Sequence, residues 1–122
     1  MTAIERTLFD SDHEIFRDTV RRFVEEEIAP FHAQWEKDGK ISRDAWLKAG
    51  ELGLLCASMP EEYGGGGVER THSVILLEEL ARAGATGPGF GLHSEIVAPY
   101  INRYGSEEQK RKFLPKMAKG EM

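Results

Sequence analysis

The sequence is poor in cysteine, in positive charge and in long apolar runs, and each shortage excludes a class of protein. Its single cysteine, Cys56, rules out an intramolecular disulfide and any metal site built from several cysteines. That cysteine lies in an apolar connector, which predicts a buried and unreactive thiol. The 21 acidic residues outnumber the 16 basic ones, and the net charge of −5 argues against a nucleic-acid partner. No apolar run approaches the roughly 20 residues that cross a membrane.

The first residues, MTAIERTLFDSDHE, also lack the hydrophobic core of a secretory signal. A cytoplasmic location is therefore expected, and a single cysteine suits a reducing compartment. Strict apolar–polar alternation between hairpin turns is missing too, as is any internal repeat. The 122 residues, 40% of them hydrophobic, predict one all-α domain over 1–122. Its expected architecture is an orthogonal or up-down bundle of about five helices.

Caps, glycines and prolines mark where the helices begin, end and bend. Two capping-box patterns, Ser11–Glu14 and Ser106–Gln109, indicate two helix starts. Pro30 and Pro99 fall inside expected helices and predict kinks, because proline removes one backbone hydrogen bond. The expected helices are Ser11 to about Lys37, Arg43 to Leu52, Thr71 to Ala83, Phe90 to Tyr104, and a last helix after Ser106.

The stretch from Gly87 to Gly105 joins a glycine-rich lead to an apolar helix, and it is the candidate for a binding site. Gly87 and Gly89 allow close approach of another backbone or a ligand, and Pro88 suits a helix start. Apolar residues then recur on one broad face: Phe90, Leu92, Ile96, Val97, Tyr100, Ile101 and Tyr104. Such a stripe is typical of a helix packed in a core. Small residues at its mouth leave open a second interpretation, a slot for a long aliphatic ligand.

The residues alone predict no catalytic or metal site. The run Gly64–Gly67 is followed by Val-Glu-Arg rather than the Lys-Ser/Thr of a phosphate-binding loop, so tight turns are expected. One Glu-x-x-His pair, Glu69 and His72, falls short of the two pairs that a di-iron bundle needs. His93 cannot form a relay with Ser94 and Glu95, since neighbours on a helix point about 100° apart. We expect His93 to be partly buried with its hydrogen bonds satisfied.

Several short motifs follow one another along nearly the whole chain. They are EEIAP (26–30), WEK (35–37), LGL (52–54), PEEYGG (60–65), EELAR (78–82), GSEEQK (105–110), FLP (113–115) and KGE (119–121). This ordered set resembles the N-terminal helical domain of the acyl-CoA dehydrogenases. GPGF (87–90), followed by HS (93–94) and IV (96–97), is most similar to the long-chain-specific branch. Gly66 departs from the pattern, because many relatives carry a larger apolar residue there.

The resemblance implies a homotetramer of three-domain subunits that holds FAD against an acyl-CoA thioester. In that family a glutamate removes the α-proton, the β-hydrogen leaves as hydride to the flavin, and an electron-transfer flavoprotein takes the electrons. The glutamate and most flavin contacts belong to the β-domain and the second helical domain. The resemblance therefore implies a truncated chain with no catalytic or cofactor-binding residue, inactive by itself.

The resemblance also implies which residues touch the substrate. The helix from Phe90 to Tyr104 lines the end of the acyl-chain cavity, and the implied wall is Gly87, Pro88, Gly89, Phe90, Leu92, His93, Ile96 and Val97. Each buried methylene of a tail contributes about 0.8 kcal/mol, so a deeper cavity favours longer chains. Phe16 is the expected contact for the electron-transfer partner.

Two other hypotheses stay open. One is a free-standing helical interaction module derived from this fold, with no flavin partner. The other is a helical metal protein, which requires bound iron or manganese after purification. If the resemblance holds, the faces that meet the β-domain and the second helical domain in the family are apolar and exposed in this chain. This predicts that the chain self-associates.

Overall fold

The computed structural model describes residues 3–122, which form helices, turns and loops. The first segment runs through α1 (Ser11–Phe23), the π-helical turn η1 (Val24–Ile28) and α2 (Ala29–Asp38), and α3 (Arg43–Glu51) follows. Next come the 3-10 turn η2 (Glu61–Tyr63), α4 (Arg70–Arg82), the π-helical turn η3 (Leu92–Val97), α5 (Ala98–Tyr104) and α6 (Glu107–Ala118). These five continuous helical segments confirm the all-α prediction. None of the helices in this range is long and apolar enough to cross a bilayer.

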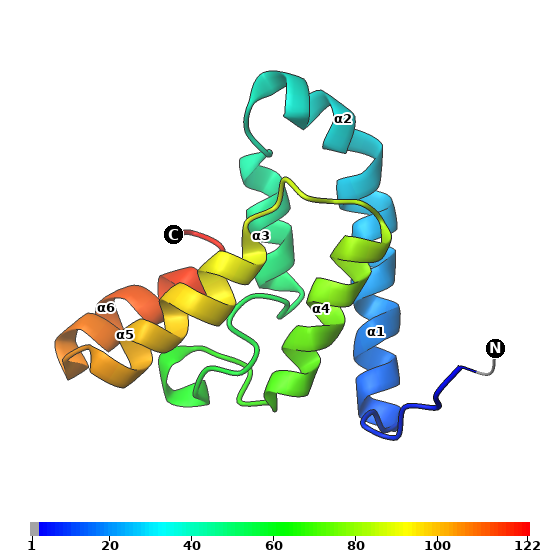
Figure 1. The fold of residues 1–122 in the computed structure, drawn as a ribbon. Coiled ribbons are helices and arrows are strands. Elements are labelled where there is room, and N and C mark those ends of the chain that lie inside the picture. The colour runs from blue at the N-terminus through cyan, green and yellow to red at the C-terminus, as the bar shows by residue number, and fades with distance from the viewer. Residues whose placement is uncertain (1–2) are drawn as a thin grey trace.

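The helices form two groups (Figure 1). α1, α3 and α4 stand side by side, with α1 and α4 running in one direction and α3 in the other, while α5 and α6 form a hairpin that extends away from them. The main core lies within the first group and also receives Phe90 from the start of the segment leading to α5. A second cluster packs under the hairpin and contains Cys56, Met59, Tyr63, Ala98, Leu114, Met117 and Ala118.

The helix starts agree with the predicted caps to within one residue. Asp10, and not Ser11, is the N-cap of α1: its carboxylate accepts a hydrogen bond from the His13 N–H at 3.1 Å. The His13 Nδ1 accepts from the Asp10 N–H at 3.2 Å, so Glu14 is not the reciprocal partner. The box at Ser106–Gln109 forms as predicted.

A π-helical turn precedes each of the two prolines that were predicted to kink a helix. Pro30 lies in the first turn of α2, directly after η1, and Pro99 lies in the first turn of α5, directly after η3. Proline donates no N–H and its ring crowds the preceding turn of an α-helix, whereas a π turn is wider. The backbone therefore accommodates both prolines by widening before them.

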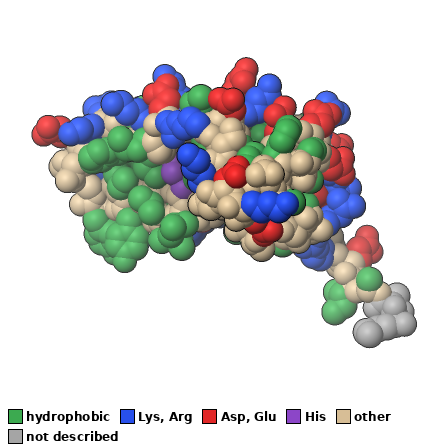
Figure 2. Space-filling view, turned by 90° about the horizontal axis from the view of Figure 1, so that it is seen from above, with side chains coloured by type: hydrophobic (Ala, Val, Ile, Leu, Met, Phe, Trp, Pro, Cys, Tyr) green, Lys and Arg blue, Asp and Glu red, His purple; other side chains and the backbone are tan. Residues whose placement is uncertain are grey.

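The apolar stripe of the η3–α5 segment is mostly exposed, so the core-packing interpretation is wrong for most of its members. Phe90 is fully buried, but Leu92 is 61% exposed, Tyr100 65% and Tyr104 71%. Figure 2 shows hydrophobic side chains gathered on the side of the molecule where α5 and α6 lie. On α4, Leu77 is also 42% exposed.

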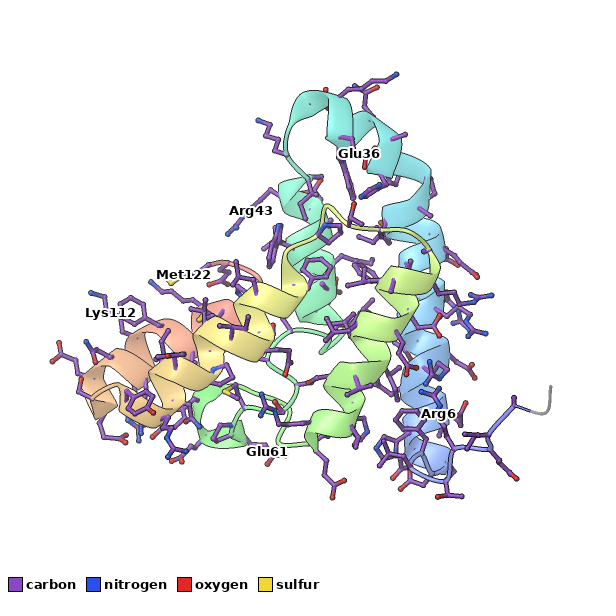
Figure 3. All side chains as sticks on the ribbon, viewed as in Figure 1. Arg6, Glu36, Arg43, Glu61, Lys112 and Met122 are labelled. Atoms are coloured by element: carbon purple, nitrogen blue, oxygen red, sulfur yellow. The ribbon has the colours of Figure 1, made fainter. Side chains whose placement is uncertain are left out.

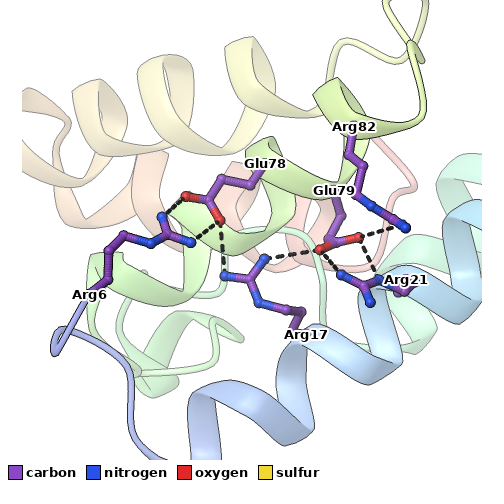
Figure 4. A network of polar contacts seen from close by, with 6 residues as sticks. All are labelled: Arg6, Arg17, Arg21, Glu78, Glu79 and Arg82. Atoms are coloured by element: carbon purple, nitrogen blue, oxygen red, sulfur yellow. Dashed lines mark hydrogen bonds and ion pairs between the residues drawn. The ribbon is translucent and has the colours of Figure 1, made fainter. Parts of the chain in front are cut away.

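Two adjacent glutamates of α4 fasten it to α1 (Figure 4). Glu79 is 3% exposed and accepts hydrogen bonds from Arg21 Nη2 at 2.9 Å and from Arg17 Nη1 at 3.0 Å. Glu78 accepts from Arg17 Nη2 at 2.9 Å and also pairs with Arg6. The hydrogen bonds from Arg21 and then Arg17 outweigh burial and hold the pKa of Glu79 below its ordinary value.

Candidate functional site

An apolar groove of about 550 Å³ lies between α3, the η3–α5 segment and α6. None of the side chains that line it is acidic, lysine or arginine, and the polar ones are His93, Gln109 and the indole N–H of Trp46. The lining is Trp46, Gly89, Leu92, His93, Val97, Ile101, Gly105, Gln109, Phe113, Met117 and Met122. Such a surface suits an aliphatic chain or another apolar protein element better than a charged ligand.

Close backbone packing between α3 and the C-terminal turn supports one end of the groove. A Cβ at Gly120 would lie 2.1 Å from the Trp46 carbonyl oxygen, and one at Gly50 would meet the C-terminal backbone at 2.2 Å. Gly120 also has a left-handed φ of 74°, which glycine adopts without a steric cost. The Arg43 guanidinium, at the start of α3, donates a hydrogen bond to the Glu121 carbonyl. Figure 3 shows Arg43 on the same side of the molecule as Met122. These contacts place Trp46 beside the end of the chain.

Phe90 anchors the wall that faces Trp46. Its ring meets the Trp46 ring edge-on, with centroids 4.7 Å apart, and lies 6.2 Å from the Phe23 ring in the core. From this anchor η3 presents Leu92 and Val97 to the groove, and Val97 is 41% exposed. Burying one such side chain is worth about 1.5–3 kcal/mol, so an exposed apolar row over a groove indicates a binding surface.

His93 is held at the groove by hydrogen bonds at both ring nitrogens. Its Nε2 lies 2.6 Å from the Met122 carbonyl oxygen and its Nδ1 lies 3.0 Å from the Ser94 hydroxyl. The contact with Ser94 shows that the expectation of no side-chain contact between these two neighbours was wrong. The same hydroxyl accepts the Cys56 N–H at 2.9 Å, so it is free to donate to Nδ1 while Nε2–H donates to Met122. Burial lowers the pKa of His93, although the bond to the Met122 carbonyl opposes that shift. The expected satisfied, partly buried histidine is confirmed, and it also lines the groove.

The structure distributes the predicted wall residues over several environments. Four of them, Gly89, Leu92, His93 and Val97, line the groove. Phe90 and Pro88 are buried. Two face elsewhere: Gly87 packs against His32 of α2, and Ile96 lies with Tyr100 and Tyr104 on another side of the η3–α5 segment.

Sequence reasoning missed most of the opposite wall. Trp46 was not among the predicted site residues, yet it lines the groove. Phe113 and Met117 also line the groove. Their spacing of four residues predicts that they share one face of a helix, but it does not predict which element that face contacts.

No hydrolytic or metal chemistry is assembled at the groove. In the part of the chain that the structure describes, no three His, Cys, Asp or Glu side chains lie together in a way that holds a metal ion. Burial raises the pKa of the Cys56 thiol to about 11, so this cysteine is a poor nucleophile at neutral pH. What the groove can do is bind apolar groups and exclude water.

Residues 10–121 match the family model described as acyl-CoA dehydrogenase, N-terminal domain. The match spans almost the whole chain, including every helix of the structure. The chain belongs to the acyl-CoA dehydrogenase family.

The chain is also similar to individual members of the acyl-CoA dehydrogenase family, both in sequence and in fold. The long-chain specific acyl-CoA dehydrogenase of Sus scrofa mitochondria is 51% identical over 115 residues, which are 94% of this chain and 27% of that enzyme. An acyl-CoA dehydrogenase from Geobacillus kaustophilus superposes with a TM-score of 0.91 at 44% identity, covering 97% of this chain and 31% of that one. An acyl-CoA dehydrogenase of Bacillus anthracis complexed with FAD gives 0.85 at 37% identity, covering 97% and 20%. The chain thus spans under a third of these relatives.

The glycine run of this acyl-CoA dehydrogenase domain packs against neighbouring backbone. A Cβ at Gly65 would lie 2.2 Å from the Met59 carbonyl oxygen. The Gly66 and Gly67 amides donate to the Cys56 and Met59 carbonyls, at 3.3 and 2.9 Å. These glycines therefore serve close packing of the backbone, as the expected tight turns require, and the absence of a cofactor-binding residue stays a prediction.

Phe16, the residue expected to meet an electron-transfer partner, lies away from the groove on α1. Its half-buried ring meets the His72 ring edge-on at 5.2 Å, and His72 stacks in turn on His13. The electron-transfer role of Phe16 stays a prediction.

Proposed function

We propose that residues 1–122 act as the N-terminal domain of an FAD-dependent enzyme that introduces a double bond between the α- and β-carbons of long-chain acyl-CoA thioesters. Family membership supports the reaction class, and the 51% identity to a relative named as long-chain specific supports the chain length. The single observation that carries the proposal is the apolar groove formed by the η3–α5 segment with α3 and α6.

The role of this chain in the reaction is to receive the acyl tail and keep water away from it. Burial of each methylene contributes about 0.8 kcal/mol, so each two-carbon unit that fits adds about 1.6 kcal/mol, or roughly fifteenfold in affinity. Gly89 leaves the mouth of the groove open, because a Cβ there would meet no atom within 4 Å. Because a longer groove buries more methylenes of the tail, a groove of this kind favours substrates with long chains.

The chemical step lies outside this chain. The flavin accepts hydride when it is bound, and both the flavin contacts and the base are assigned to the domains that the longer relatives possess. Gly89, Leu92, His93 and Val97 bind the tail and exclude water, which strengthens the electrostatic interactions at the reacting carbons. By itself the chain is expected to be inactive.

The partners follow from the same proposal. An acyl-CoA is the substrate, an electron-transfer flavoprotein docks near Phe16, and the full-length enzyme is a homotetramer. The groove is apolar and the chain carries a net charge of −5, so neither supports a nucleic-acid partner. The predicted compartment is the cytoplasm, although the Sus scrofa relative is named as mitochondrial.

An anaerobic absorbance scan tests the proposal. The protein is expressed with any coding sequence that follows Met122 in its gene, and palmitoyl-CoA or butyryl-CoA is added. We expect a yellow protein whose flavin absorbance bleaches at a lower concentration of palmitoyl-CoA than of butyryl-CoA. A yellow protein that neither thioester bleaches contradicts the proposed reaction. A colourless protein from a frame that stops at Met122 favours the interaction module instead.

A further inference from the structure

The loop between α4 and η3 is attached to α2 by one side chain. The Gly87 N–H donates to Nε2 of His32, with 2.9 Å between the two nitrogens. The next residue, Pro88, has no N–H, so this is the last loop amide before Gly89 at the mouth of the groove. The carbonyl of Gly89 then accepts the His93 N–H at 3.0 Å, which starts the helical hydrogen bonding of η3. The residue that is hydrogen-bonded to His32 thus comes directly before the groove wall in the sequence.

The surroundings of His32 select the ring form that can accept this bond. Its side chain is 13% exposed and borders a cavity of about 150 Å³ together with Trp35, Ile41 and Gly87. Because the Gly87 N–H donates to Nε2, that nitrogen accepts and the ring N–H is on Nδ1, which lies 3.8 Å from the Glu36 carboxylate. A Cβ at position 87 would lie 3.0 Å from Nε2, so glycine allows the contact to form.

We propose that His32 is a positioning residue for the groove: its neutral Nε2 holds the Gly87 amide and thereby fixes Gly89 and the first turn of η3. The importance of this positioning for an acyl tail rests on the proposed function. The hydrogen bond between the Gly87 N–H and His32, called the clamp below, does not depend on that function. In this role His32 acts on the groove through the backbone of the loop.

Amide hydrogen exchange measured by NMR on this chain, without any ligand, tests the clamp. In His32→Ala the Gly87 amide is expected to exchange about fivefold faster, the usual effect of losing one hydrogen bond, and the His93 amide should follow. His32→Gln, which carries an amide oxygen near the position of Nε2, should restore slow exchange, and His32→Asn, with its oxygen nearer the position of Nδ1, should not. The imidazole nitrogen shifts of the parent protein should show Nε2 without a proton.

Two controls separate positioning from a general loss of structure. The Ile75 amide, buried in the core, should exchange at the same rate in all of these proteins. Gln34→Ala, on the same helix and bonded only locally to Asp38, should leave Gly87 unchanged. The proposal is overturned if Gly87 exchanges equally fast in parent and His32→Ala, if Ile75 accelerates as much as Gly87 does, or if His32→Gln behaves like His32→Ala. None of these outcomes bears on the proposed reaction, because no acyl-CoA or flavin is present.

Discussion

Replacing Glu79 by glutamine removes the negative charge at the centre of the contact between α1 and α4. The carboxylate is 3% exposed and accepts three hydrogen bonds from Arg17 and Arg21, at 2.9 to 3.0 Å. Removing one partner of a buried ion pair costs about 3–5 kcal/mol. Arg17 retains Glu78, and the amide oxygen still accepts a bond, so Glu79→Gln should lower the free energy of unfolding by about 3 kcal/mol at neutral pH.

The pH dependence of that loss identifies its cause. The pKa of Glu79 is lower in the folded protein, so its contribution is present above the unfolded-state pKa and is lost as pH falls through the folded-state pKa. Urea unfolding of parent and variant should therefore differ most at neutral pH and converge in acid. Glu51→Gln, at an exposed position of α3, is the control and should change stability by less than about 0.5 kcal/mol. A Glu79→Gln difference that is equally small, or that persists unchanged in acid, refutes the reasoning.

Two further predictions concern the packing around the glycine run. Gly65→Ala forces a Cβ against the Met59 carbonyl and should lower the free energy of unfolding by at least about 2 kcal/mol in urea, whereas Gly89→Ala, which meets open space, should be nearly neutral; equal effects would contradict the packing argument. The Cys56 thiol, fully buried with its pKa raised to about 11, should not react with an aromatic disulfide reagent at about pH 8 until urea unfolds the chain, and rapid reaction of the native protein would show that the site opens.

Local features of the fold were predictable because they depend on neighbouring residues. The box at Ser106–Gln109 formed as expected, and the helix starts followed the capping residues. At α1 the sequence indicated Ser11, but Asp10 is the cap, and its partner His13 returns the hydrogen bond. The prolines marked the positions where the backbone departs from α-helical geometry, and a π turn precedes each of them.

The site depended on contacts that periodicity does not encode. A stripe of apolar residues has the same pattern whether it meets a core or a groove, and so the exposure of Leu92 and Val97 was not predictable from spacing. Trp46 and Met117 come from distant parts of the chain and meet at the groove through the close approach of α3 and the C-terminal turn at Gly120. The hydrogen bond between His32 and Gly87 likewise joins α2 to a loop 55 residues further along the chain, and no local pattern connects the two.

The central claim, that the groove receives the acyl tail, is tested most directly by narrowing it at Gly89. Gly89→Val adds a branched side chain where the structure has open space, and so it should shorten the groove without unfolding the protein. In the full-length enzyme, the ratio of kcat/KM for palmitoyl-CoA to that for butyryl-CoA is the measurement. Exclusion of two methylenes predicts a fall of roughly fifteenfold in that ratio, carried by the long-chain substrate alone. An unchanged ratio in a folded, flavin-loaded variant would contradict the account.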